Sequence, residues 1–144
     1  MGQRARLFML THIEHLFPKL ASSSYRVTSQ LTNKYNCIAW AASECHRPWW
    51  PGGAPEAYWP PNLPPDETLD NFTNAFIEIG YEVCTGAHYE WRFEKIALYV
   101  NRRGVPTHAA KQTWTGAWIS KLGKNVDIKH RTHLMFLREA STVQ

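Results

Sequence analysis

Cysteine is scarce in this sequence, and the cysteines present form no recognisable pair. The chain of 144 residues contains three, Cys37, Cys45 and Cys84. An odd number without CxxC spacing argues against a disulfide framework and favours a reducing compartment. Cys37 and Cys45 would lie about 12 Å apart along a continuous helix, which is beyond the reach of a disulfide bond. We therefore expect three free thiols.

Long hydrophobic runs are also lacking, so we expect no transmembrane helix and no contact with a membrane. The amino-terminal segment MGQRARLFMLTHIEHLF begins with basic residues, as a signal peptide does. Its apolar stretch, LFML, is too short for a signal peptide. Myristoylation would require Ser or Thr at position 6, where this chain has Arg6. These features predict a cytoplasmic protein, while export by a leaderless secretion system would leave no mark in the sequence.

Basic residues outnumber acidic ones, but they do not cluster. The net charge is +4 and the pI is about 9.1, which favours a weak attraction to anions. The densest basic cluster is the pair Arg102 and Arg103, and the sequence has neither a basic arm nor an RNP motif. We therefore expect no nucleic-acid partner.

Histidine and cysteine do not combine into a metal-binding motif. The pairs are Cys45-His46, His12/His15 and His130/His133. None of them completes a four-ligand spacing such as CxxC…HxxxH. We expect neither a metal ion nor another cofactor.

Helical spacing of apolar residues appears mainly in the first half of the chain. In residues 1–20 it runs until Pro18 and predicts an amino-terminal helix. Residues 37–45 favour a short helix, preceded by an extended approach. Residues 66–79 favour a longer helix, with Asp66 as its cap.

A period of two dominates the second half. It predicts an antiparallel meander over 93–123, and a final helix follows; the expected strands are 93–100, 105–112 and 117–122, and the expected helix is 128–138. Helices followed by a small antiparallel sheet indicate an α+β fold. The length is typical of one domain, so we expect residues 1–144 to share a single core.

A segment rich in proline and tryptophan separates the two halves. Residues 46–65 contain seven prolines, together with Trp49, Trp50, Tyr58 and Trp59. Proline fixes φ and removes a backbone donor, which excludes regular structure, while a disordered linker would not carry so many aromatic residues. We expect an ordered loop that either covers the core or forms one wall of a cleft.

Cys37 is the residue on which a catalytic interpretation depends. It stands where a helix is expected to begin, and free N–H groups at such a position stabilise a thiolate. His108 lies in the middle of a predicted strand and is the candidate base; Asn36 or the backbone N–H of Cys37 is the candidate donor to an oxyanion. A thiol in this arrangement should have a pKa of roughly 4–7, below the ordinary value of about 8.5.

Two stretches resemble the papain-like superfamily of thiol hydrolases, which includes the NlpC-like cell-wall amidases. YNC at 35–37 resembles the Tyr-Asp-Cys helix start, and THAAKQTWTGAWISKLG at 107–123 resembles the papain-type His strand and the strand after it. The chain is also similar to small bacterial domains of unassigned activity with YNCIAWA, HAA and W-x-SKLG motifs. The papain-type alignment makes His108 the base, whereas the NlpC-type alignment gives His108 the third, orienting position.

The residue that would orient His108 is left open by the sequence. In the papain-type alignment the orienting position falls on Leu122, which has no polar group. Gln112, Ser120 and Asp127 are the polar alternatives, with Asp127 favoured and Ser120 second. A hairpin loop of even length would place His108 on the face of Lys121, and a three-residue loop would place it with Ser120.

Two functional hypotheses follow. The first is a cysteine hydrolase or acyltransferase that acts on a peptide or protein, as in a delivered effector; Cys37 and His108 would be catalytic, and Tyr35, Trp40, Trp50 and Trp59 would contact the substrate. The alternative is a non-catalytic domain that binds protein or carbohydrate through its Trp/Pro-rich segment. Cys37 would then be a buried core residue. A Cys37 sulfur within about 3–4 Å of a His108 nitrogen would favour the enzyme. The oligomeric state is open.

Overall fold

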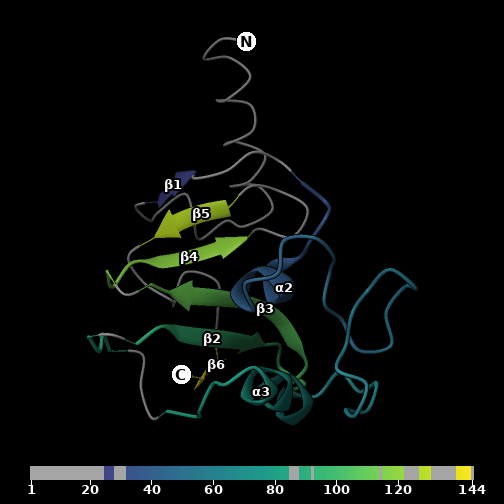
Figure 1. Ribbon diagram of the computed structural model, residues 1–144. Coiled ribbons are helices and arrows are strands. Elements are labelled where there is room, and N and C mark those ends of the chain that lie inside the picture. Colours follow the sequence, from purple (N-terminus) through teal and green to yellow (C-terminus); the bar gives the residue numbers. More distant parts are fainter. Residues whose placement is uncertain are drawn as a thin grey trace, which may run out of the picture.

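The computed structural model describes residues 25–27, 32–84, 88–91, 93–113, 115–121, 127–130 and 139–143. These residues combine helices with antiparallel strands, as an α+β fold requires (Figure 1). The helix predicted within residues 1–20 lies outside the described residues, as do residues 131–138 of the predicted final helix.

The strands of the described residues form one antiparallel sheet in the order β1-β5-β4-β3-β2-β6 (Figure 1). Their bounds are β1 Tyr25–Val27, β2 Lys95–Val100, β3 Pro106–Gln112, β4 Trp118–Lys121, β5 Asp127–His130 and β6 Glu139–Val143. The predicted meander is confirmed as β2, β3 and β4. Its two turns contain Gly104 and Gly116, whose φ values of +76° and +86° suit glycine.

The prediction of a helix from residue 128 is wrong at its start. Residues 127–130 form β5, which pairs with β4 on one side and with β1 on the other. A short helix is only marginally stable by itself. Pairing on both sides, in contrast, provides hydrogen-bond partners for the backbone groups of residues 127–130.

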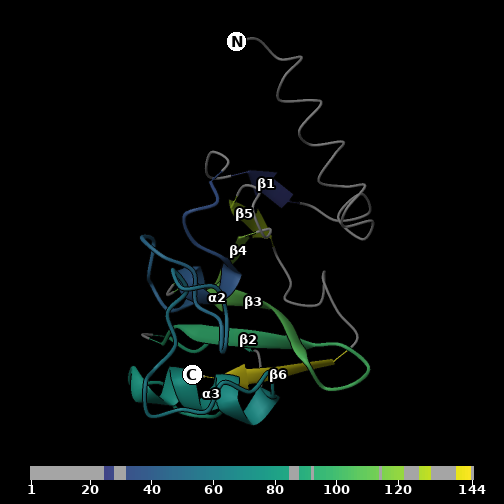
Figure 2. The ribbon, with the colours of Figure 1, turned by 90° about the vertical axis from the view of Figure 1, so that its right-hand side faces the viewer.

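Register divides the side chains of the sheet between two faces. In antiparallel strands, residues directly opposite each other share a face. Leu98 pairs with Ala109, and Tyr99 pairs with His108. One buried cluster contains Ile96, Leu98 and Ala109 together with residues of both helices, and a second contains Ala97, Tyr99, Ala110 and Trp118. Figure 2 shows both helices on the same side of the sheet.

The two described helices begin and end at identifiable capping residues. Helix α2 spans Cys37–Ala41 and is shorter than expected because Ser43 adopts a φ of +65°, which is incompatible with a continuing helix. Helix α3 spans Leu69–Glu78, and its cap is Thr68, not Asp66 as predicted. The Thr68 hydroxyl accepts a hydrogen bond from the Asn71 backbone N–H at 3.2 Å.

The Trp/Pro-rich segment is packed against the helices. Trp49 is buried, whereas Trp50 and Trp59 are half-buried, and the rings of these two lie 5.2 and 4.9 Å from the ring of Phe72 in α3. Backbone hydrogen bonds from Trp50 to Tyr58 and from Tyr58 to Pro48 close the segment into a loop. The interpretation as a packed cover is therefore confirmed for Trp49 and holds in part for Trp50 and Trp59.

Asn36 fastens this loop to α2. Its Oδ1 accepts hydrogen bonds from the backbone N–H groups of Ala39 at 3.0 Å and Trp49 at 3.2 Å. Its Nδ2 donates to the Trp49 carbonyl at 2.8 Å. One side chain thus caps the helix and pairs both backbone groups of a buried residue thirteen positions away.

Replacement of Asn36 by Ala should lower the free energy of unfolding by about 2–4 kcal/mol, because the cap is lost and two backbone groups of Trp49 lose their partner. Asn36→Asp is the matched control. It keeps both acceptor bonds and replaces the donor to the Trp49 carbonyl by a carboxylate oxygen, so its cost isolates the contribution of that single contact. Urea unfolding of the three proteins measures the difference, and equal stability of Asn36→Ala and the parent would contradict the role of this side chain.

Candidate functional site

Cys37 begins α2, as predicted, but its thiol points into the core. The residue is only 6% exposed and belongs to the cluster between the helices and the sheet. The backbone N–H of Ala109 in β3 hydrogen-bonds the sulfur. This contact places the thiol against β3, at the residue that follows His108.

Burial raises the pKa of the Cys37 thiol above its ordinary value. The backbone N–H groups of Ala109, Ile38 and Cys37 act in the opposite direction, as does the positive charge of Lys121, but they do not outweigh desolvation. The expectation of a lowered pKa is therefore wrong. The predicted site assumed a thiolate at an open helix start, whereas the helix is packed against the sheet.

His108 lies on the other face of the sheet. It pairs with Tyr99, and the two ring centroids are 5.4 Å apart. Tyr99 belongs to the cluster opposite the helices, whereas Cys37 packs with Leu98 and Ala109 on the helix face. The register therefore places His108 and the core residues that pack around Cys37 on opposite faces of the sheet.

The candidate orienting residues for His108 can also be assigned to the faces of the sheet. β3 and β4 are joined by residues 113–117, and Gln112 pairs with Trp118. This odd loop length places Ser120 and Gln112 on the face of His108, and Lys121 on the helix face. Asp127, the favoured candidate, begins β5 opposite Lys121. Ser120 and Gln112 thus share the face of His108, but that face does not carry Cys37.

The predicted oxyanion donor is already engaged. The Asn36 amide donates to the Trp49 carbonyl and accepts from two N–H groups, so it holds the loop instead of facing a substrate. The bond to the Trp49 carbonyl uses one of the two N–H donors of the amide.

The aromatic residues predicted to contact substrate have packing partners. The Tyr35 ring lies 5.0 Å from the Lys121 ammonium, and the Trp40 ring lies 5.5 Å from the Lys111 ammonium. The Trp50 indole donates to Glu67 at 2.7 Å, and Trp59 stacks on Phe72. Tyr35 and Trp40 stay near Cys37 on the helix face, whereas Trp50 and Trp59 cover α3.

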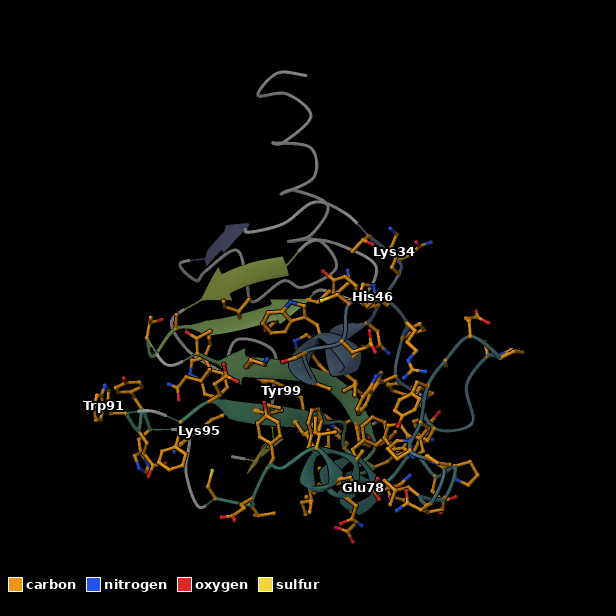
Figure 3. The ribbon with its side chains drawn as sticks, in the orientation of Figure 1. Lys34, His46, Glu78, Trp91, Lys95 and Tyr99 are labelled. Carbon is orange, nitrogen blue, oxygen red and sulfur yellow. The ribbon has the colours of Figure 1, made fainter. Side chains whose placement is uncertain are left out.

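Among the described residues, the most exposed aromatic side chains lie elsewhere, just before β2. Tyr89 is 45% exposed, Trp91 68% and Phe93 52%. A hydrogen bond from the Phe93 N–H to the Glu90 carbonyl, at 3.1 Å, forms a turn with Trp91 at its tip. We call residues 89–91 and 93 the Trp91 turn. Figure 3 shows Trp91 at the margin of the molecule, on the side away from the Trp/Pro-rich loop.

The base of the Trp91 turn is held by buried groups. The Lys95 ammonium, whose side chain is 1% exposed, lies 2.5 Å from the Glu90 carboxylate. This hydrogen bond lowers the pKa of Glu90 below its ordinary value. The Tyr89 ring lies against Gly116, where an added Cβ would come within 3.3 Å of the ring. The turn thus projects from a fixed base.

The sequence analysis did not predict this surface, because it assigned binding to the Trp/Pro-rich segment. The signal was HYEWRFE at 88–94, in which aromatic and charged residues alternate between the predicted helix and the first strand of the predicted meander. When aromatic and charged residues alternate in a segment that does not pair as a strand, the aromatic side chains are exposed to solvent.

Comparison with known proteins places the chain in a family. The family model described as Domain of unknown function (DUF7689) matches residues 26–138, and the chain belongs to this family. A search of curated proteins and a search of solved structures each found no match.

In the described part of the chain, no helix is long and apolar enough to span a bilayer. No group of three or more His, Cys, Asp or Glu side chains there is placed to hold a metal ion.

Alkylation by iodoacetamide at neutral pH should follow exposure. Cys45 is exposed, Cys84 is intermediate and Cys37 is buried, so we expect Cys45 to react first and Cys37 last. Peptide mapping after timed quenching measures the order, and urea-unfolded protein is the control in which the three rates should converge. Fastest reaction at Cys37 in the folded protein would overturn the assignment of this residue to the core.

The raised pKa of Cys37 predicts a loss of stability in alkali. Its neutral thiol contributes stability that is fully present below the unfolded-state pKa of about 8.5 and is lost as pH rises through the higher folded-state value. Cys37→Ala removes this ionisation, so the stability difference between Cys37→Ala and the parent should shrink between pH 7 and pH 10. Urea unfolding at the two pH values measures it. A difference independent of pH would contradict the raised pKa.

Proposed function

We propose that this chain is a protein-binding domain and that the Trp91 turn is its contact surface. The observation that carries the proposal is the exposure of three aromatic side chains within five residues. Exposed apolar groups of this size are costly in water, and clusters of them mark interaction sites. Trp and Tyr also dominate the binding energy of protein interfaces.

The fixed base of the turn supports the same function. Ordering a flexible loop on binding costs free energy, and a loop already held in one conformation avoids much of that cost. The ion pair between Lys95 and Glu90 and the seat of Tyr89 on Gly116 hold the turn before any partner arrives. Trp91 is therefore presented as an anchor for insertion into an apolar pocket.

The carboxylates that border the turn are already paired. The side chains of Glu90 and Glu94 are 39% and 47% exposed, and they lie 2.5 Å from the Lys95 ammonium and 3.9 Å from the Lys111 ammonium, respectively. An apolar pocket is therefore the partner surface that the turn fits best, because exposed charge pairs add little affinity.

A cysteine hydrolase of the papain-like type is the second candidate. The contact of the Cys37 thiol with the Ala109 N–H, next to His108 in the chain, favours it. The mechanism would require the His108 ring to leave Tyr99 and reach the helix face, and the thiol to ionise against the effect of burial. The geometry therefore supports the binding domain better.

A photoreactive amino acid at position 91 should form covalent adducts with a discrete protein in the cells that express the chain. The same group at position 55, exposed in the Trp/Pro-rich loop, is the control and should not give that adduct. The double variant Tyr89→Ala/Phe93→Ala should weaken the adduct at position 91. Identical adduct patterns from both positions would refute the proposal.

A stability comparison separates this surface from the core. Trp91→Ala should change the free energy of unfolding by no more than about 0.5 kcal/mol, because the side chain is 68% exposed. Trp49→Ala should cost about 3–5 kcal/mol, because that indole is 5% exposed and packs in the core. Thermal and urea unfolding measure both. A large loss in Trp91→Ala would mean that Trp91 supports the fold.

A further inference from the structure

A hydroxyl and an amine meet on the helix face, beyond the end of α2. The Lys111 ammonium nitrogen in β3 lies 2.7 Å from the Ser43 hydroxyl oxygen, although the residues are 68 positions apart in the chain. The lysine donates this hydrogen bond, and after the loss of one proton its amine could accept from the hydroxyl at the same separation. Ser43 is exposed, whereas the Lys111 side chain is 10% exposed, so reagents reach the hydroxyl while the amine stays sheltered.

The backbone at Ser43 is strained. Its φ of +65° lies in the left-handed region, and among the described residues other than glycine it alone has a positive φ. Glycine adopts this conformation without penalty, whereas serine holds it at a cost. The left-handed turn ends α2, with the Glu44 N–H bonded to the Ala39 carbonyl at 2.8 Å, and Ser43 at this turn contacts Lys111.

The surroundings of Lys111 bear on its protonation. Burial lowers the pKa of Lys111, and the charges of Glu94 and Cys45 act in the opposite direction. The Glu94 carboxylate is 3.9 Å from the ammonium, and the Trp40 ring lies 5.5 Å from it on another side. Removal from water favours the neutral amine and is the largest effect, whereas the Glu94 carboxylate and the Trp40 ring favour the ammonium.

We propose that Ser43 and Lys111 form a hydroxyl–amine pair that accepts acyl groups from activated esters, with Ser43 as the nucleophile and Lys111 as its base. This activity is independent of the binding surface at Trp91. Serine–lysine pairs of this kind replace the serine–histidine pair in some hydrolases.

The chemical step balances with the groups present. The Ser43 oxygen forms a bond to the acyl carbon as its proton moves to the neutral Lys111 amine. The bond from the acyl carbon to the leaving alkoxide then breaks, and the Lys111 ammonium returns the proton to that alkoxide. The product is an ester on Ser43, and water releases the acid by the reverse sequence.

A fluorophosphonate probe tests the pair in the full-length chain. The Ser43 oxygen should attack phosphorus and displace fluoride, leaving one adduct that peptide mapping locates at Ser43. Cys45→Ser serves as the background, which removes the exposed thiol nearby. Ser43→Gly should abolish labelling with the fold intact, because glycine suits the positive φ; circular dichroism checks the fold.

The base is tested by two variants with opposite effects. Lys111→Arg keeps the positive charge but cannot accept the proton, so labelling should slow by roughly 10²-fold. Glu94→Gln removes the carboxylate that favours the ammonium, so labelling near pH 8 should be faster. A purely structural hydrogen bond predicts neither change. Absence of an adduct at Ser43, an unchanged rate in Lys111→Arg, or no gain in Glu94→Gln would each overturn the proposal.

Discussion

The arrangement of the helix face depends on the Asn36 side chain. An amide has one acceptor oxygen and one donor nitrogen, and here both are directed at backbone groups of buried segments. The loop that follows α2 has little regular structure, so its polar backbone must find partners elsewhere. By pairing Trp49 in both directions, Asn36 lets an irregular, proline-rich segment bury a large indole and cover the core. No residue of another type supplies the cap, the acceptor and the donor at this length.

The sheet imposes a second constraint, because it determines which side chains can react with each other. Both faces of β2 are buried, because every residue from 95 to 100 is shielded from solvent. A strand buried on both sides carries two sets of side chains that cannot meet. His108 belongs to one set, whereas Leu98 and Ala109, which pack with Cys37, belong to the other, although the Ala109 N–H bonds the thiol. Proximity along a strand is therefore a poor guide to proximity in a site.

The sequence predicted what depends on local pattern. The period of two located β2, β3 and β4, and proline-rich composition indicated an irregular but packed loop around Trp49. The end of α2 was not predictable, because nothing about serine at position 43 announces a left-handed φ. The face of His108 was not predictable either. It depends on which side of the sheet α2 covers and on the irregular register between Tyr99 and Val100, and both are set by tertiary packing.

The pairing of β1 with β5 joins two strands that are far apart in the chain. Tyr25 lies opposite His130, although 105 residues separate them in the chain. Contacts of such high sequence separation close slowly, because the entropy of a long loop is lost before they form. During synthesis on the ribosome, β1 leaves the exit tunnel first and has no partner until β5 follows it. The early strand must therefore wait, with its backbone groups hydrated, while α2, the loop and α3 can already fold on local contacts.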